Sequence, residues 1–278
     1  MRKYAIGAVV SGALAVSALA VPTASAATPD LSFSNAVVNN GKAIVVGTTG
    51  VVKVPITYTL VRPADFVIDG RTSGAGVVLY NGSSLARLEN LLAPDDLPTC
   101  TTTATTATTV TESCKEVIAV YPQDYFYGAS DAGTWKVAGY YGHTSTDNDD
   151  SDNHISTEFG SDMWGLPGTA QIKRAARLTA NATPEPVKKG STLTVKGALT
   201  RADWATGKYA GYKGQPAALQ FKAKGATAYK TVKTVTSGTA GALSTTVKAS
   251  ADGTYRYLFA GTATTGTATA TGDYVDVK

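Results

Sequence analysis

One phrase occurs twice in this chain, and that repetition constrains the fold more than any other feature. Asp131–Gly142 reads DAGTWKVAGYYG, and Ala251–Gly261 reads ADGTYRYLFAG. A second echo precedes each copy, since LVRPADF over 60–66 corresponds to LTRADW over 199–204. Two shared phrases in the same order predict two copies of one structural module.

Short runs of alternating apolar and polar residues fill the second copy. In one of them Leu243, Thr245 and Val247 share one face, and the residues between them share the other. Such short runs cover 192–199, 218–222, 231–235, 243–248, 255–260 and 274–277. Short strands separated by turn residues, with no helical pattern between them, predict an immunoglobulin-like β-sandwich.

The repeated phrase also fits a local feature of immunoglobulin domains. In those domains an aromatic residue near the start of strand F follows an Asp-x-Gly pattern and bonds back to the chain just upstream. Trp135 and Tyr255 fit this position. Val137 and Tyr257 stand where the strand-F cysteine would be, so an antibody-type disulfide between strands B and F is excluded.

The N-terminal residues have the features of a secretory signal peptide. Arg2 and Lys3 precede the apolar stretch Ala5–Val21, and small residues at 24 and 26 form a cleavage pattern. We expect residues 1–26 to be removed. The mature protein would then be secreted, extracellular or cell-wall associated, with no membrane span.

The sequence thus predicts an all-β protein with two tandem immunoglobulin-like β-sandwich domains after a cleaved signal peptide. We place the first domain at 28–174 and the second at 191–278. Residues 175–190 contain Pro184 and Pro186 and are interpreted as a stiff linker. Leu85–Leu92 (LARLENLL) has helical spacing and predicts a helix that Pro94 ends.

The chain contains two cysteines, Cys100 and Cys114. In an oxidising compartment an isolated pair is most simply a disulfide. The bond would enclose a threonine-rich segment, 99–111, that lacks apolar periodicity. We therefore expect an exposed excursion that is pinned at its base.

The second module also carries a family resemblance. Its segments VKGALTRADW, YAGYKGQPAALQFKAKG, YKTVKTV, DGTYRYLFAG and GDYVDVK resemble the C-terminal bacterial Ig-like domain of secreted actinobacterial (Streptomyces-like) two-domain proteins. The resemblance is strong over 175–278 and loose over 28–174. It implies a secreted Ig-like protein and supplies no catalytic residues, and some members are labelled calcium-binding.

Side chains suited to catalysis are scarce. His143 and His154 are the only imidazoles, and the sequence contains no G-x-S-x-G elbow, no H-E-x-x-H pair and no Walker loop. We therefore expect no enzyme. Carboxylates far apart in sequence can still meet in space, so an uncharacterised extracellular hydrolase stays open as an alternative.

An acidic loop is the best candidate for chemistry. DNDDSD over 147–152 places four carboxylates in six residues, and a hard cation would relieve their repulsion. Its oxygen-bearing residues follow the register of an EF-hand loop, although Asp152 replaces the required glycine and no helices flank it. We expect either a solvated loop or a weak calcium site formed by Asp147, Asp149, Ser151, Asp152 and Glu158.

Charge is divided unevenly along the mature chain. Residues 27–174 contain nine Lys and Arg against sixteen Asp and Glu, a net charge of −7, whereas residues 175–278 contain fourteen against five, a net charge of +9. A basic domain on a secreted chain favours anionic polymers as partners. The expected contact is either a patch for such a polymer or merely a solvated face, and it is formed by Lys222, Lys224, Lys230 and Lys233.

These features together predict a secreted, non-enzymatic binding or structural protein that is associated with the cell envelope. Its partner would be an anionic cell-wall polymer or another envelope protein. Nucleic acid is not expected, because no stacking platform or groove-binding motif is visible. The one cofactor considered is calcium, and a weak calcium-binding protein is the main alternative.

Overall fold

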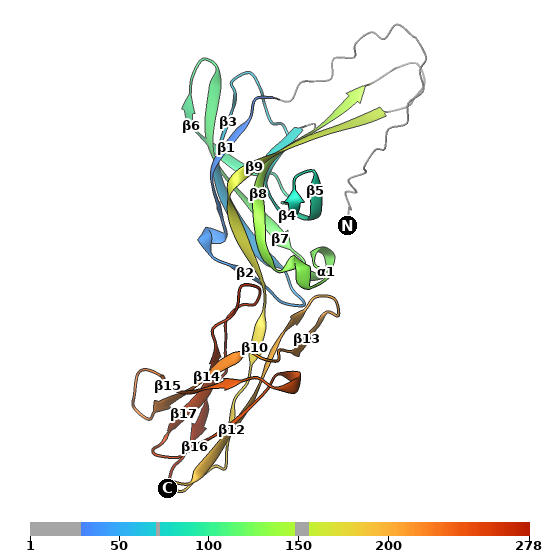
Figure 1. Ribbon diagram of the computed structural model, residues 1–278. Coiled ribbons are helices and arrows are strands. Elements are labelled where there is room, and N and C mark those ends of the chain that lie inside the picture. The colour runs from blue at the N-terminus through green and yellow to red at the C-terminus, as the bar shows by residue number, and fades with distance from the viewer. Residues whose placement is uncertain (1–28, 71–72, 148–155) are drawn as a thin grey trace, which may run out of the picture.

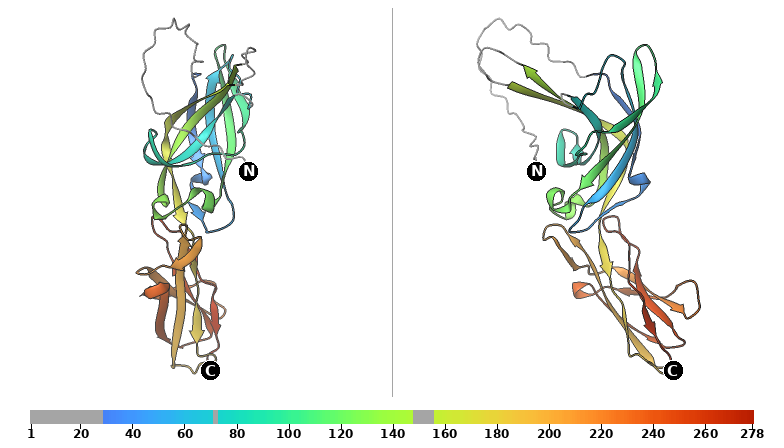
Figure 2. Two further views of the ribbon diagram at one scale, coloured as in Figure 1. Left: turned by 90° about the vertical axis from the view of Figure 1, so that its right-hand side faces the viewer. Right: turned by 180° about the vertical axis from the view of Figure 1, so that it is seen from behind.

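Two β-sandwich domains lie end to end in the computed structural model, which describes residues 29–70, 73–147 and 156–278 (Figure 1). The expected signal peptide over 1–26 lies outside these residues. Both turned views show the domains following one another along one long axis (Figure 2).

The first domain consists of a four-stranded and a five-stranded sheet. The order of the first sheet is β1-β3-β7-β6, and that of the second is β2-β9-β8-β4-β5. The strands are β1 (Ser32–Val38), β2 (Ile44–Val46), β3 (Val52–Pro63), β4 (Ser73–Ser84), β5 (Arg87–Leu92), β6 (Thr99–Thr105), β7 (Thr109–Val120), β8 (Gly133–Asp147) and β9 (Ser156–Arg174). This order matches the immunoglobulin fold, in which strands A, B, E and D form one sheet and C, F and G lie in the other.

The second domain repeats this plan with shorter strands. In one sheet β12 pairs with β10, β11, β13 and β16, and the other sheet has the order β15-β14-β17-β18, with β19 also paired to β17. Its strands are β10 (Ala176–Leu178), β11 (Asn181–Thr183), β12 (Thr192–Asp203), β13 (Lys208–Gly211), β14 (Pro216–Ala223), β15 (Lys230–Thr236), β16 (Ala242–Lys248), β17 (Gly253–Phe259), β18 (Ala268–Thr269) and β19 (Asp273–Val275). Two immunoglobulin-like sandwiches in tandem confirm the predicted fold class.

Helical structure in the described residues is confined to single turns. They lie at the ends of strands and reverse the chain between the two sheets. The turns are η1 (Asn39–Gly41), α1 (Pro122–Tyr125), η2 (Ala129–Asp131) and η3 (Thr239–Gly241).

Alternation along the strands places apolar side chains between the sheets. On β3, Val54, Ile56, Tyr58 and Leu60 are buried at 0–3% exposure, and the alternate residues between them face outward. On β17, Tyr255 and Tyr257 play the same part. Each domain therefore has its own apolar core, and the predicted period-2 pattern is what forms it.

Both copies of the repeated phrase lie at the start of strand F, in β8 and β17. In the first copy Trp135 Nε1 donates to the carbonyl oxygen of Asp131 at 2.8 Å, so the indole bonds back to the chain as the pattern predicts. The Asp131 carboxylate accepts from the backbone N–H groups of Tyr127 and Gly128 at 2.7 and 3.0 Å. The aspartate of the phrase therefore fixes the turn that precedes the strand.

The second copy keeps the aspartate but bonds its aromatic ring differently. Asp252 Oδ1 accepts from the backbone N–H of Val277 at 2.9 Å. Tyr257, two residues after the expected position, donates its hydroxyl to the carbonyl oxygen of Val195 at 2.9 Å. The phrase is one residue shorter here, so the hydrogen bond joins the two sheets instead of returning to the same turn.

The helix predicted at Leu85–Leu92 is wrong. Arg87–Leu92 is strand β5, which pairs with β4 through a register that shifts at Gly82. Leu92 is fully buried in the core of the domain. The helical spacing did not decide the structure. Pairing with β4 and burial of Leu92 stabilise this segment as a strand more than a short isolated helix would be stabilised.

The segment 175–190, predicted to be a linker, is part of the second domain. Only Ala175 separates β9 from β10, and β11 follows at once. Leu178, Ala182 and Val187 are buried in the second core, at 8%, 1% and 3% exposure. This stretch is rich in prolines and lysines and has few inward-facing apolar residues. The sequence therefore shows no alternation of apolar and polar residues that would indicate a strand.

The disulfide between Cys100 and Cys114 is confirmed. The two residues face each other across the antiparallel pair β6–β7, with their Cα atoms 4.1 Å apart. The threonine-rich segment between them is an exposed hairpin at the edge of the sheet. The bond therefore holds the edge strand β6 to its neighbour β7.

Loss of this disulfide should weaken the domain without unfolding it. Closing a loop of this length stabilises a protein by about 3 kcal/mol on the chain-entropy model. Cys100→Ser should therefore lower the Tm by roughly 5–10 °C in scanning calorimetry. Wild type treated with a reductant is the control and should match the variant. An unchanged Tm in both would contradict a stabilising role.

Candidate binding site at the domain junction

Three aromatic rings cross the boundary between the domains. Trp204, in the turn after β12, stacks on Phe126 with ring centroids 4.4 Å apart. Phe126 meets Trp135 of β8 edge to face, with centroids 5.9 Å apart. All three rings are almost fully buried. The indole of the second domain is thus part of the hydrophobic core of the first.

Hydrogen bonds fix the same boundary. Ala175 donates its N–H to the carbonyl oxygen of Val46 in the first domain and accepts from the N–H of Ala202 in the second, both at 2.8 Å. Trp204 Nε1 donates to the carbonyl oxygen of Gly47 at 2.9 Å. The connection between β9 and β10 is bonded on both sides and cannot act as a free hinge.

A shallow depression of about 310 Å³ lies beside the aromatic stack. Its walls are Gln123, Phe126 and Tyr127 from the first domain and residues 204–207 from the second. The Tyr127 ring is 71% exposed, and its hydroxyl donates to the carbonyl oxygen of Asp124 at 2.9 Å. Gln123 Nε2 donates to the carbonyl oxygen of Thr48 at 3.4 Å.

The chemistry of this depression suits a neutral group. None of its lining side chains carries a charge, and aromatic, amide and hydroxyl groups share the wall. Its volume is at the lower end for small-molecule sites, which favour domain interfaces. A sugar ring or the side chain of a protein partner would match this surface better than a charged ligand.

The four lysines of the expected patch do not share one surface. Lys222 lies on the outer face of β14, with its Nζ 5.1 Å from the centre of the Tyr229 ring. Arg256 covers the same ring at 3.6 Å and is held by Gln220 Oε1 at 2.9 Å. An aromatic ring with two cations beside it therefore marks this outer face.

Lys230 and Lys233 lie on the edge strand β15, and Lys224 lies in the turn after β14. Lys230 pairs with Phe221, a residue of the inward phase, so the two side chains leave the sheet on the side opposite to Lys222. Lys233 Nζ donates to the carbonyl oxygen of Thr246 at 3.5 Å. Lys224 Nζ lies 3.4 Å from a carboxylate oxygen of Asp252 and is the one lysine of the four with an ion pair among the described residues.

Of the expected calcium ligands, Asp147 and Glu158 lie on the paired strands β8 and β9. Asp149, Ser151 and Asp152 lie outside the described residues. Asp147 ends β8, and Glu158 lies in β9, paired with Ser145. The backbone thus brings the two ends of the acidic loop together, and calcium binding stays a prediction.

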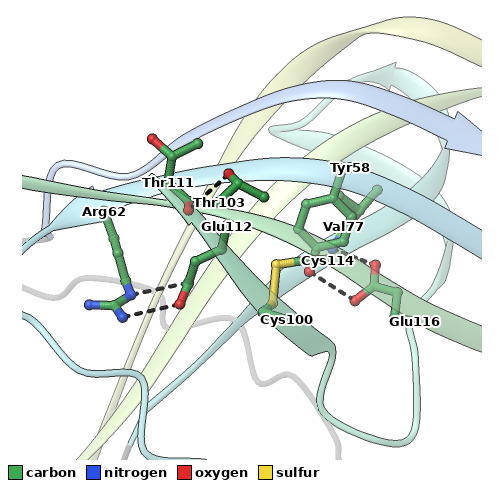
Figure 3. The surroundings of a disulfide bond; sticks show 9 residues. All are labelled: Tyr58, Arg62, Val77, Cys100, Thr103, Thr111, Glu112, Cys114 and Glu116. Atoms are coloured by element: carbon green, nitrogen blue, oxygen red, sulfur yellow. Dashed lines mark hydrogen bonds and ion pairs between the residues drawn. A yellow bond between two sulfur atoms is a disulfide. The ribbon is translucent and has the colours of Figure 1, made fainter. Parts of the chain in front are cut away.

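The region of the disulfide contains a buried carboxylate, Glu116 (Figure 3). It is 6% exposed, on the inward face of β7. Val77 of β4 donates its N–H to Oε1 at 2.8 Å, and Tyr58 of β3 donates its hydroxyl to Oε2 at 3.4 Å. Burial raises the pKa of Glu116 to about 7, although both hydrogen bonds act to lower it. The carboxyl joins the sheets and is out of reach of a substrate.

A possible metal cluster lies nearby. Cys100, Glu112 and Cys114 offer ligand atoms within 4.8 Å of one another. The two sulfur atoms are joined to each other, and Glu112 accepts two hydrogen bonds from Arg62 at 3.1 Å (Figure 3). These donor atoms are already occupied, so the cluster is interpreted as structural.

Sequence reasoning missed the junction. The run YPQDYFY over 121–127 is rich in aromatic residues, and the second echo ends in an aromatic residue in both domains. Phe66, the first-domain counterpart of Trp204, packs within its own domain on Tyr141. Only the three-dimensional structure shows that the second copy packs against a different domain.

Comparisons with known proteins do not assign this chain to a family, so its class is defined by the strand order. No protein-family model matches the chain, and no curated protein matches it. The solved ectodomain of mouse nectin-like molecule 4 (Ig1–Ig3) is similar over 88% of this chain and 65% of its own length, with 15% identity and a TM-score of 0.22. Similarity at that level says nothing about a shared partner. The strand order itself defines a protein of two tandem immunoglobulin-like domains.

Removing the junction indole should free the domains from each other. Trp204→Ala should destabilise the protein by about 3–5 kcal/mol, because it deletes a buried ring and its hydrogen bond. Small-angle scattering should then show a wider spread of overall dimensions. Phe66→Ala is the matched control, since it removes the equivalent ring without touching the junction. Identical scattering for both variants and wild type would contradict the anchor role.

Glu116 should make the stability of the protein fall as pH rises. Its pKa is raised from the usual value of about 4.3 in the unfolded chain to about 7 when folded, so the folded state keeps the proton over that interval. The contribution of Glu116 to stability is therefore greatest below about pH 4 and should drop by about 3 kcal/mol as the pH reaches about 7.

Chemical denaturation between pH 4 and 8 measures this dependence. Glu116→Gln should flatten the curve, because the amide keeps an acceptor for the Val77 N–H and carries no charge. Glu112→Gln is the control on the same strand and should retain the fall. If Glu116→Gln retains the full slope, this carboxyl is not its source.

Proposed function

We propose that this chain is a secreted, non-catalytic binding protein of the cell envelope, and that its second domain binds an anionic cell-wall polymer. The disulfide and the immunoglobulin-like fold are both common in extracellular binding proteins. Within the described residues, no helix has the length and apolar character needed to cross a bilayer. The raised pKa of Glu116 belongs to a carboxyl without access to solvent, which argues against a role as an acid or base.

One observation carries the proposal, namely the surplus of unpaired cations on the second domain. Of its fourteen basic residues, only Lys224 and Lys278 form ion pairs within the described part of the chain. Their partners are Asp252 and Asp276, and two of the domain's five carboxylates also accept hydrogen bonds from the backbone. Asp273 Oδ2 accepts from the N–H of Ala182 at 2.7 Å, and Asp252 Oδ1 accepts from that of Val277. Few acidic groups are left to neutralise the lysines.

Long-range attraction of a polyanion requires such a surface. Exposed lysines attract a chain of phosphates without fixed geometry, and the attraction is screened over about 10 Å at 0.1 M salt. The division of Lys222 and Lys230 between two sides of the sheet is compatible with this mode, because a polymer can wrap around an edge. It would not suit a compact ligand.

A specific observation favours a second candidate, contact with another envelope protein. Tyr127 is 71% exposed beside the depression at the junction, although its backbone is held by Asp131. Exposed, well-supported tyrosines are typical anchors of protein interfaces. This surface is uncharged, so binding there would be insensitive to salt.

Sedimentation of the mature chain with purified cell walls separates the two candidates. Wild type should be retained at about 0.05 M salt and released by about 0.5 M. Reversal of Lys222, Lys230 and Lys233 to Glu should abolish retention with little change in Tm, since surface substitutions cost little. The matched control reverses the exposed lysines of the first domain, Lys42, Lys53 and Lys115, and should leave retention intact.

Two results would count against the polymer. Absence of retention at any salt concentration would rule out the wall as partner. Retention that survives both high salt and the reversals would rule out the electrostatic mode, and would favour the uncharged surface around Tyr127.

A further inference from the structure

The last residue of β9, Arg174, is buried without an ion pair among the described residues. Its backbone is held by the second domain, with its N–H donating to Thr264 at 3.0 Å and its carbonyl accepting from Gly266 at 2.9 Å. The residue is 7% exposed. Its Nε is the one buried side-chain nitrogen or oxygen of the described residues that has no hydrogen-bond partner.

An unpaired guanidinium in this position is energetically unfavourable. Within the described residues no carboxylate lies within 4.0 Å of Arg174. Burial lowers the pKa of its guanidinium, and the charge of Arg201 lowers it further. The group nonetheless stays protonated, since the pKa of arginine begins above 12. Buried polar groups without a protein partner are commonly satisfied by a water molecule or an ion.

Arg201 brings a second cation to the same place. The pairing of Ala176 with Arg201 puts Arg174, two residues before Ala176, on the same face of the two strands. Arg201 Nη1 donates to Thr265 Oγ1 at 3.4 Å, and its guanidinium lies 3.9 Å from the centre of the Tyr212 ring. Thr265 is fully buried and forms a bridge with Arg174. Thr265 therefore adjoins both arginines, Arg201 through its hydroxyl and Arg174 through its backbone.

The acidic group nearest to them is engaged elsewhere. Extension of the same register places Asp203 opposite Arg174. The charge of Asp203 raises the pKa of Arg174, but this effect is smaller than those of burial and of Arg201, which lower it. Its Oδ2 accepts from Thr206 Oγ1 at 2.9 Å. Two guanidinium groups and one carboxylate leave a net positive charge at this position, where Arg174 is buried and Arg201 and Asp203 are half-buried.

We propose that Arg174 and Arg201, with the hydroxyl of Thr265 between them, bind a small oxyanion of the phosphate class at the domain junction. Guanidinium groups present paired N–H donors that match the oxygens of phosphate, and a dianion balances both of them. This site lies between the sheets of the second domain, away from the surface lysines. It does not depend on the polymer-binding proposal.

Thermal unfolding of the full mature chain tests this site. Potassium phosphate and potassium chloride are compared at the same ionic strength and pH. Phosphate at about 100 times its Kd should raise the Tm of wild type by roughly 5–10 °C, and the rise should saturate. Arg174→Met and Arg201→Met should each lose this rise. Arg177→Met is the matched control and should keep it, because Arg177 is exposed and stacks on Tyr209 at 3.6 Å.

A further variant distinguishes the anion from an internal partner. If the site binds phosphate, Asp203→Asn retains or increases the phosphate-dependent rise, and Arg174→Met is more stable than wild type in chloride because it removes an unpaired buried charge. Should Arg174→Met fail to fold, Arg201→Met and calorimetric titration of wild type with phosphate decide the matter.

The source of the phosphate is resolved by a second titration. Binding of inorganic phosphate without binding of a glycerol phosphate polymer identifies a small free anion as the source, and binding of both shows that the polymer can also supply the phosphate group. Equal Tm values in phosphate and chloride would overturn the proposal. So would a loss of stability in Asp203→Asn with no response to phosphate, since Asp203 would then be the partner of Arg174.

Discussion

The stack of Trp204 on Phe126, continued by Trp135, is the interaction on which the two-domain structure depends. It takes one ring from each of the two repeated phrases and one from Phe126, the residue directly after the single turn α1. Because the rings are buried, the core of the first domain is completed by a residue of the second. The hydrogen bonds of Ala175 to both domains then leave the connection no freedom of its own.

The sequence was informative where period and repetition carry the signal. Alternation along β3, β12 and β16 predicted strands, and the duplicated phrase predicted both strand F and the turn that Asp131 holds. The sequence was uninformative where a single tertiary contact determines the secondary structure or the packing of a residue. Three-residue strands such as β10 and β11 are too short to show a period, and the leucines of β5 suit a helix until pairing with β4 selects a strand. The role of Trp204 was invisible because an echo in sequence does not reveal what the second copy touches.

Two buried charges illustrate how differently a sandwich can accommodate them. Glu116 replaces an apolar residue on an inward face, yet the Val77 N–H and the Tyr58 hydroxyl satisfy it, and its raised pKa favours the neutral acid. Arg174 has no such remedy, because it retains its proton and its Nε has no partner. The first charge can be explained from the chain alone. The second is the charge that the proposed oxyanion would balance.

The direct passage from β9 to β10 makes the molecule a spacer of fixed reach. The hairpin β8–β9 projects from the far end of the first domain, and the C-terminus lies at the opposite end of the second (Figure 1). One strand of 19 residues, β9, forms an arm of that hairpin and continues to the junction. A partner held at either end would therefore meet the other end at a constant distance and orientation, and tension along the long axis would be shared by both sandwiches instead of being absorbed at a joint between them.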